Sequence, residues 1–165
     1  MGIKFNADEV FEMAIRAEEN GGKFYRRAAE VKADDQEAVE LLLKLAKMED
    51  GHKETFEKMR QELGENVTEQ TTFDPYMEAS LYLAAMADGS HIEGAPSVAG
   101  KLTAEHSLKD ILITAVGLEK EAVLFYTSMK DMVSLEMGKR KVDEIIEEEK
   151  VHIVQLTAHL KKLDG

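Results

Sequence analysis

The chain has 165 residues, 44% of them hydrophobic, which suffices for one core and argues against fibrous, disordered and membrane-spanning classes. Its 33 acidic and 21 basic residues leave a formal charge of −12, so the sequence predicts no nucleic-acid partner. Cysteine is absent, which excludes disulfides and thiolate-bound metals, and any metal must be held by oxygen and imidazole.

Two blocks free of proline predict four long helices. Pro75 and Pro96 both fall between residues 64 and 106, and on either side apolar residues recur at three- and four-residue steps. Polar residues that suit helix ends divide the blocks: Asn6, Asp34, Asp35, Ser107 and Ser134. The predicted helices cover residues 7–31, 36–63, 108–132 and 135–163. Short connections within each block favour an all-α, antiparallel four-helix bundle of two hairpins.

The segment between the hairpins is too long for a plain loop. Asp74-Pro75 suits the start of a helix and Asp88-Gly89 its end, so we expect a short helix there, followed by an irregular stretch containing Gly94, Pro96 and Gly100. This crossover could return to its own bundle or exchange with a second subunit. We interpret residues 1–165 as one domain, with a hairpin over 7–63, a crossover over 64–106 and a hairpin over 107–163.

The two hairpins look like copies of one unit. Matching residues are 101 positions apart in the first helix of each hairpin and 100 apart in the second. The matches are Glu18 with Glu119, Phe24-Tyr25 with Phe125-Tyr126, Glu49 with Glu149, and His52 with His152.

Charged residues of this repeat fall on the apolar seams of their helices. Heptad spacing places four glutamates and two histidines among core positions, and the two glutamates of each hairpin lie equally far from its turn. These six residues, expected in one layer, are Glu18, Glu49, His52, Glu119, Glu149 and His152. Four carboxylates inside an apolar bundle would repel each other strongly, and two divalent cations would balance them. Oxygen-rich ligation with one imidazole per ion suits iron or manganese, with zinc as an alternative.

With these motifs, the sequence resembles the rubrerythrin branch of the ferritin-like superfamily over both hairpins. The resemblance rests on Glu18, Glu119, both Phe-Tyr pairs, Glu49-Asp50-Gly51-His52 and Glu149-Lys150-Val151-His152. It implies a ferritin-like fold and a bridged di-iron site that reacts with hydrogen peroxide or dioxygen, often in a homodimer with exchanged helices. Within that site, Glu49 and Glu149 are the candidate bridging ligands, and Glu18 and Glu119 the candidate terminal ligands.

Two features depart from this family pattern. Rubrerythrins proper append a four-cysteine domain that feeds electrons to the di-iron centre, and this chain has no cysteine. They also carry a further glutamate on the third helix, to which one iron shifts on reduction, and that position here is Ala122. We therefore expect an external electron donor protein.

Other residues near the seams have less specific interpretations. Tyr25 and Tyr126 are expected to be buried core residues with a satisfied hydroxyl, or else to hydrogen-bond a ligand carboxylate or act as a local electron source. Gly21-Gly22 would allow close packing, or admit a metal or small oxidant. Glu148 is expected on a solvated helix face.

The leading functional hypothesis is a di-iron oxidoreductase that reduces peroxide or dioxygen. Iron sequestration or ferroxidase-linked storage is the alternative, and a metal-free interaction module and di-manganese chemistry also stay open. Because no signal-peptide pattern is present and the longest apolar run, Leu81 to Ala87, is too short to cross a bilayer, we expect a cytoplasmic protein without membrane contact.

Overall fold

The computed structural model describes residues 7–63, 81, 98–132 and 136–165. It confirms an all-α fold, and the described residues contain no strand. The four long helices are α1 (Ala7–Val31), α2 (Gln36–Leu63), α5 (Leu108–Met132) and α6 (Glu136–Asp164). The bounds predicted for the first three are those observed, and α6 lies one residue further along the chain than predicted.

Side-chain caps explain where two of these helices begin. The backbone N–H of Ala38 donates to Asp35 Oδ1 at 3.0 Å, which satisfies a free donor in the first turn of α2. At the start of α5, the N–H of Asp110 donates to Ser107 Oγ at 3.0 Å. Of the other proposed end signals, Asp34 lies in the turn between α1 and α2, and Asn6 and Ser134 lie outside the described residues.

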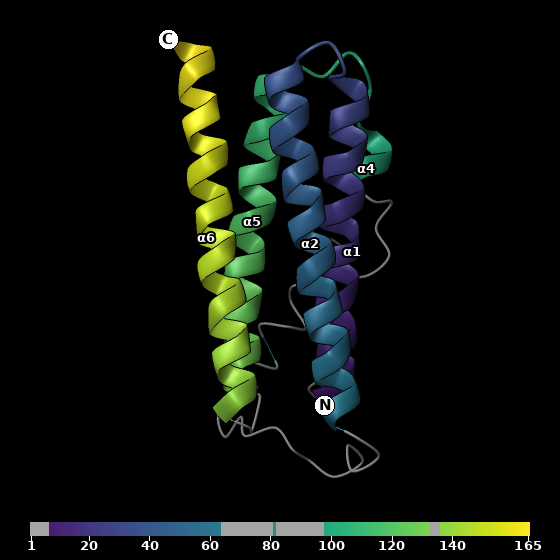
Figure 1. The fold of residues 1–165 in the computed structure, drawn as a ribbon, viewed down its shortest axis with the longest axis vertical. Helices are drawn as coiled ribbons and strands as arrows, with labels where there is room; N and C mark the ends of the chain where they lie inside the picture. The colour runs from purple at the N-terminus through teal and green to yellow at the C-terminus, as the bar shows by residue number, and fades with distance from the viewer. Residues whose placement is uncertain (1–6, 64–80, 82–97, 133–135) are drawn as a thin grey trace.

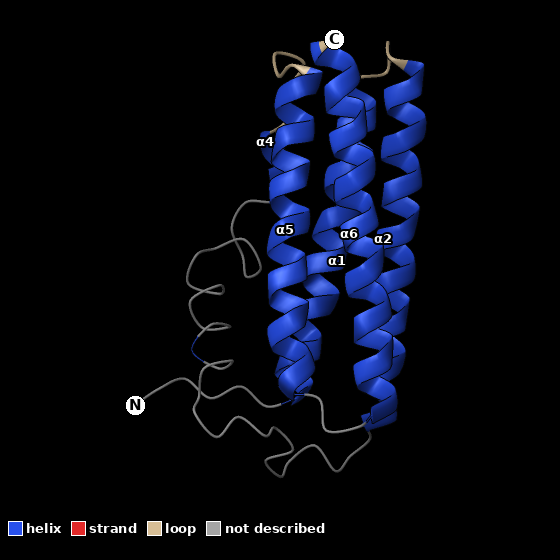
Figure 2. Cartoon of the chain, turned by 90° about the vertical axis from the view of Figure 1, so that its left-hand side faces the viewer, coloured by secondary structure: helices blue, strands red, loops and turns tan. Residues whose placement is uncertain are grey.

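The long helices stand side by side as two antiparallel hairpins (Figure 1). Helix α1 packs chiefly against α2, and α5 against α6, while α1 also contacts α5 and α2 contacts α6. Figure 2 shows the same rods from the side, with their axes nearly parallel. None of the described helices combines the length and apolar character of a membrane span.

The apolar core consists of two clusters, one toward each end of the bundle. Both clusters take side chains from all four long helices. One contains Phe11, Ala14, Phe56, Met59, Phe125, Tyr126, Met129, Val142 and Ile145. The other contains Phe24, Tyr25, Leu42, Leu45, Ile111, Leu112, Ala115 and Leu156. Between these clusters, the seam positions carry polar residues instead.

A short helix, α4 (Val98–Lys101), contains Gly100, so the prediction of an irregular stretch was wrong there, while Gly94 and Pro96 lie outside the described residues. Ala99 and Leu102 are buried in the second apolar cluster, and α4 contacts α1. Four residues are too few to show a helical period, and tertiary packing stabilises this turn. The short helix predicted between Asp74-Pro75 and Asp88-Gly89 lies outside the described residues, except for Leu81, which is helical.

Candidate metal centre

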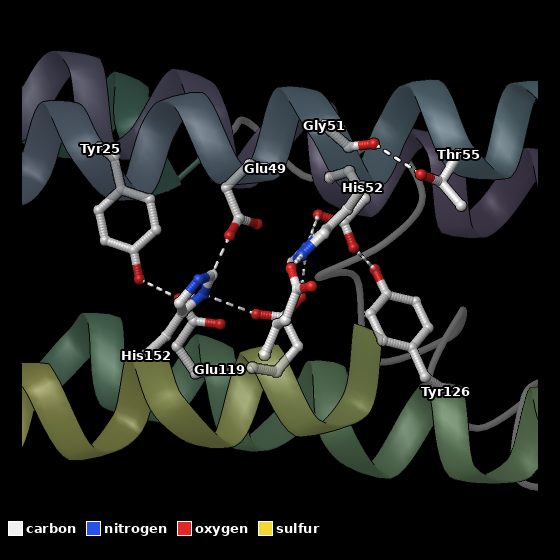
Figure 3. Close-up of polar contacts among 11 residues, drawn as sticks. Tyr25, Glu49, Gly51, His52, Thr55, Glu119, Tyr126 and His152 are labelled. Carbon is white, nitrogen blue, oxygen red and sulfur yellow. Dashed lines mark hydrogen bonds and ion pairs between the residues drawn. The ribbon is translucent and has the colours of Figure 1, made fainter. Parts of the chain in front are cut away.

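Six ionisable side chains meet in the middle of the bundle, between the two apolar clusters (Figure 3). Helices α1 and α5 supply one glutamate each, and α2 and α6 supply a glutamate and a histidine each. None of the six is more than 5% exposed: Glu18, Glu49, His52, Glu119, Glu149 and His152. The structure therefore brings together all six residues that the sequence placed on the seams. Their role as metal ligands remains a prediction.

These side chains form two overlapping groups. In each group, one potential ligand atom per residue lies within 4.8 Å of all the others. One group is Glu18, Glu49, His52 and Glu149, and the other is Glu49, Glu119, Glu149 and His152. Glu49 and Glu149 belong to both groups, so their carboxylates are placed to bridge two ions. Glu18 and Glu119 belong to one group each, as terminal ligands would.

Both histidines present Nδ1 to the carboxylates. His52 Nδ1 lies 3.1 Å from Glu149 Oε1 and 3.4 Å from Glu18 Oε2. His152 Nδ1 lies 2.8 Å from Glu149 Oε2 and 3.3 Å from Glu49 Oε1. The rings stack with centroids 5.7 Å apart. Nδ1 is therefore the nitrogen placed to bind a metal, and Nε2 points away from the shared carboxylates.

The two tyrosines reach across the hairpin interface. The Tyr25 hydroxyl on α1 donates to Glu119 Oε1 on α5, and the Tyr126 hydroxyl on α5 donates to Glu18 Oε1 on α1. Both rings are buried, as expected for core residues, and each hydroxyl is bonded to a candidate ligand. Since α1 and α5 are antiparallel, a tyrosine two turns beyond its own glutamate lies beside the glutamate of the other helix. Spacing along one helix could not identify that partner.

Burial is the main reason that three of the carboxyl groups are hard to ionise. It raises the pKa of Glu49 to about 7, helped by the negative charge of Glu149. It raises the pKa of Glu119 to about 8, although a hydrogen bond from His152 opposes it. The pKa of Glu18 is raised well above 4.5 by burial and by the charges of Glu49 and Glu149. Ionising these groups together therefore requires nearby positive charge.

The histidines supply that charge when no metal is bound. Burial would lower both imidazole pKa values, but hydrogen bonds to glutamates outweigh it and raise the pKa of His52 to about 11 and of His152 to about 12. Burial would also raise the pKa of Glu149, but bonds from His152 and His52 lower it to about 2. A bound cation would take over the role of these imidazolium protons.

The donor set fits a pair of divalent cations. Four carboxylates and two imidazoles offer hard oxygen ligands with one nitrogen for each ion. Several facing atoms are buried and have only poorly aligned histidine–carboxylate contacts among the described residues: Glu18 Oε2, Glu49 Oε1, Glu149 Oε2 and His152 Nδ1. Buried polar atoms rarely lack a partner, and metal coordination would satisfy these four.

Glycine at position 21 makes room for one shared carboxylate. A Cβ atom there would lie 2.6 Å from Glu49 Oε2, and one at Gly22 would lie 2.9 Å from Arg26 Nη1. The interpretation of Gly21-Gly22 as a place of close packing thus holds, and at Gly21 the neighbour is a candidate ligand. Ala122, three residues after Glu119, packs against an apolar cluster.

One contact of the site departs from the sequence interpretation. Glu148 was expected to face solvent only, and its side chain is 52% exposed. Its Oε2 nevertheless lies 2.7 Å from His52 Nε2, on the opposite hairpin. The heptad pattern did not predict the contact of Glu148 with His52, because Glu148 lies at the edge of the seam. Its place directly before a seam glutamate was the available signal.

The fold and the buried glutamate and histidine side chains define a ferritin-like carboxylate bundle. The sequence model of the rubrerythrin family matches residues 9–96, more than half of the chain, so the chain belongs to the rubrerythrin family. The structure is similar to a crystal structure from Thermotoga maritima described as a ferritin-like diiron-carboxylate protein. That match has 25% sequence identity and a TM-score of 0.68, and covers 95% of each chain. None of the curated proteins matches in sequence.

Proposed function

We propose that this protein is a di-iron oxidoreductase that reduces peroxide or dioxygen with electrons from an external donor protein. The observation that carries the proposal is the pair of overlapping buried groups that share Glu49 and Glu149. A bound iron pair would supply electrons one at a time and Lewis acidity. Reduction of hydrogen peroxide to two water molecules consumes two electrons and two protons.

The residues of the chain would bind and orient the ions. Glu18 and Glu119 would each hold one ion, and their other oxygen would stay bonded to a tyrosine hydroxyl. The two apolar clusters above and below the layer exclude bulk water along the bundle axis. A dry site of fixed geometry favours controlled electron transfer to a small oxidant over loss of the metal.

Peroxide and oxygen consumption by the iron-loaded protein, each with a reducing donor, test the proposal. Consumption should far exceed that of an equal amount of free iron. Glu149→Gln should abolish it because this carboxylate belongs to both groups. Glu147→Gln should not, because Glu147 is exposed and pairs with Lys150. Consumption no faster than with free iron would contradict the proposal.

Metal content and assembly size separate this proposal from its alternatives. Protein from its native host should contain iron, and manganese in its place would indicate di-manganese chemistry. Fewer than about one transition-metal ion per chain after reconstitution would favour a metal-free interaction module. Gel filtration should show a homodimer. A large hollow assembly would favour iron storage or sequestration instead.

A further inference from the structure

The repeat makes the two histidines equivalent, yet their outward nitrogens have different surroundings. His52 Nε2 on α2 lies 2.7 Å from Glu148 Oε2 on α6. His152 Nε2 is buried and has no hydrogen-bond partner among the described residues. The difference follows from one position of the repeat, because Met48 stands 100 residues before Glu148.

The contact to Glu148 determines which nitrogen of His52 is free to bind a metal. Once a bound cation has replaced the Nδ1 proton, the neutral ring of His52 keeps its remaining proton on Nε2, where it is donated to Glu148, and Nδ1 directs its lone pair to the position between Glu18 and Glu149, whose oxygens lie 3.4 and 3.1 Å away. A carboxylate that accepts this bond also fixes the ring orientation and increases the basicity of the ligand. Among the residues that the structure describes, nothing equivalent holds His152 on its outward side.

We propose that Glu148 is a positioning residue that makes the two metal positions unequal. The position formed by Glu18, Glu49, His52 and Glu149 binds its ion more tightly and fills first. The position that includes Glu119 and His152 fills second. This inference rests on the proposed dimetal site and adds an order of filling within it.

Titration of the metal-free, full-length chain with Co²⁺ alone tests the inference, because Co²⁺ absorption bands report the ligands of each ion. We expect two binding steps whose affinities differ by about 10- to 100-fold. His52→Ala should remove the tighter step and His152→Ala the weaker one. Each step should carry its own absorption spectrum.

Glu148→Met copies the residue at the matching position of the other repeat and should bring the tighter step down to the level of the weaker one. Glu148→Gln keeps an acceptor oxygen without the charge and should recover part of the difference. Met48→Glu should strengthen the weaker step. Glu147→Gln, one residue away and 70% exposed, is the matched control and should change neither step.

The possible outcomes separate the inference from the proposed function. Two equal steps in the native chain would overturn the inference and leave the dimetal site standing. An equal effect of Glu148→Met on both steps would do the same. A native chain that binds no Co²⁺ would overturn the proposed function itself. Unfolding of the metal-free variants, followed by circular dichroism, checks that Glu148→Met leaves the fold intact, as its half-exposed position leads us to expect.

Discussion

At the scale of single residues, Gly21 shows how one missing methyl group can matter for the site. In Gly21→Ala, the new Cβ would lie 2.6 Å from Glu49 Oε2, which is too close, so one group must shift. The Glu49 carboxylate is the group that moves, because it is the flexible end of its side chain. We expect Co²⁺ affinity to fall on the order of tenfold. The metal-free protein should not be destabilised, since alanine favours a helix interior by about 1 kcal/mol over glycine.

Gly117→Ala is the matched control for this substitution. Gly117 lies in α5, and a Cβ there would meet nothing within 4 Å. Gly117→Ala should stabilise the protein by about 1 kcal/mol, the helix preference of alanine over glycine, and leave Co²⁺ affinity unchanged. Calorimetric titration and urea unfolding of both variants measure the two effects. An equal affinity for Gly21→Ala and the native chain would show that Glu49 is not constrained by this contact.

The buried titrating groups predict an unusual pH dependence for the metal-free protein. The folded-state pKa values of Glu49, Glu119, His52 and His152, about 7, 8, 11 and 12, all exceed the ordinary values of 4.5 and 6.5. Such groups stabilise the fold below the ordinary pKa, and the contribution is lost as pH rises through the raised one. Glu149, whose pKa is lowered to about 2, stabilises the fold above about pH 4.5, and this contribution is lost as pH falls below that value.

The free energy of unfolding in a chelator should therefore fall from pH 5 to pH 9. With metal bound the trend should reverse, because ligands must lose protons to bind a cation. Urea unfolding at pH 5, 7 and 9, with and without Mn²⁺, measures both trends. A stability of the chelated protein that stays level or rises with pH would contradict the electrostatic account of the layer.

At the scale of helices, the tyrosine–glutamate pairs join α1 to α5, which otherwise belong to different hairpins. In Tyr25→Phe or Tyr126→Phe, the ring still packs but a buried carboxyl oxygen loses its donor. Each change should lower the free energy of unfolding by about 1–3 kcal/mol. Thr55→Val is a suitable control, because its exposed hydroxyl donates within α2, to the carbonyl of Gly51. Urea unfolding compares them, and equal stabilities would mean that the hydroxyls contribute nothing across the interface.

At the scale of the whole molecule, two bound metal ions would connect all four long helices. Each hairpin is held by extensive contacts between its own helices, whereas the hairpins meet through fewer contacts between α1 and α5 and between α2 and α6. Binding to the folded state alone adds about 2.7 kcal/mol per site at a hundred times the dissociation constant. The melting temperature should therefore rise with Fe²⁺, added without oxygen, and Glu49→Ala should remove most of that rise. A melting temperature insensitive to metal would support a metal-free interaction module.

Much of this architecture follows from local pattern. Helix-period apolar steps, polar end residues such as Asp35 and Ser107, and the absence of proline outside the crossover predicted the four long helices almost to the residue. The repeat and the equal distances from each turn predicted that the six seam residues would converge. Helix α4 escaped prediction because a single turn has no period and is stabilised by the packing of Ala99 and Leu102.

The sequence by itself determined the bundle, its two-fold repeat and the identity of the buried acidic and imidazole residues, since periodicity decides which side chains face inward. Only the tertiary structure decided the contacts between hairpins: Tyr25 with Glu119, Tyr126 with Glu18, and Glu148 with His52. These depend on the relative direction and height of helices far apart in the chain. Spacing along a single helix does not encode that arrangement.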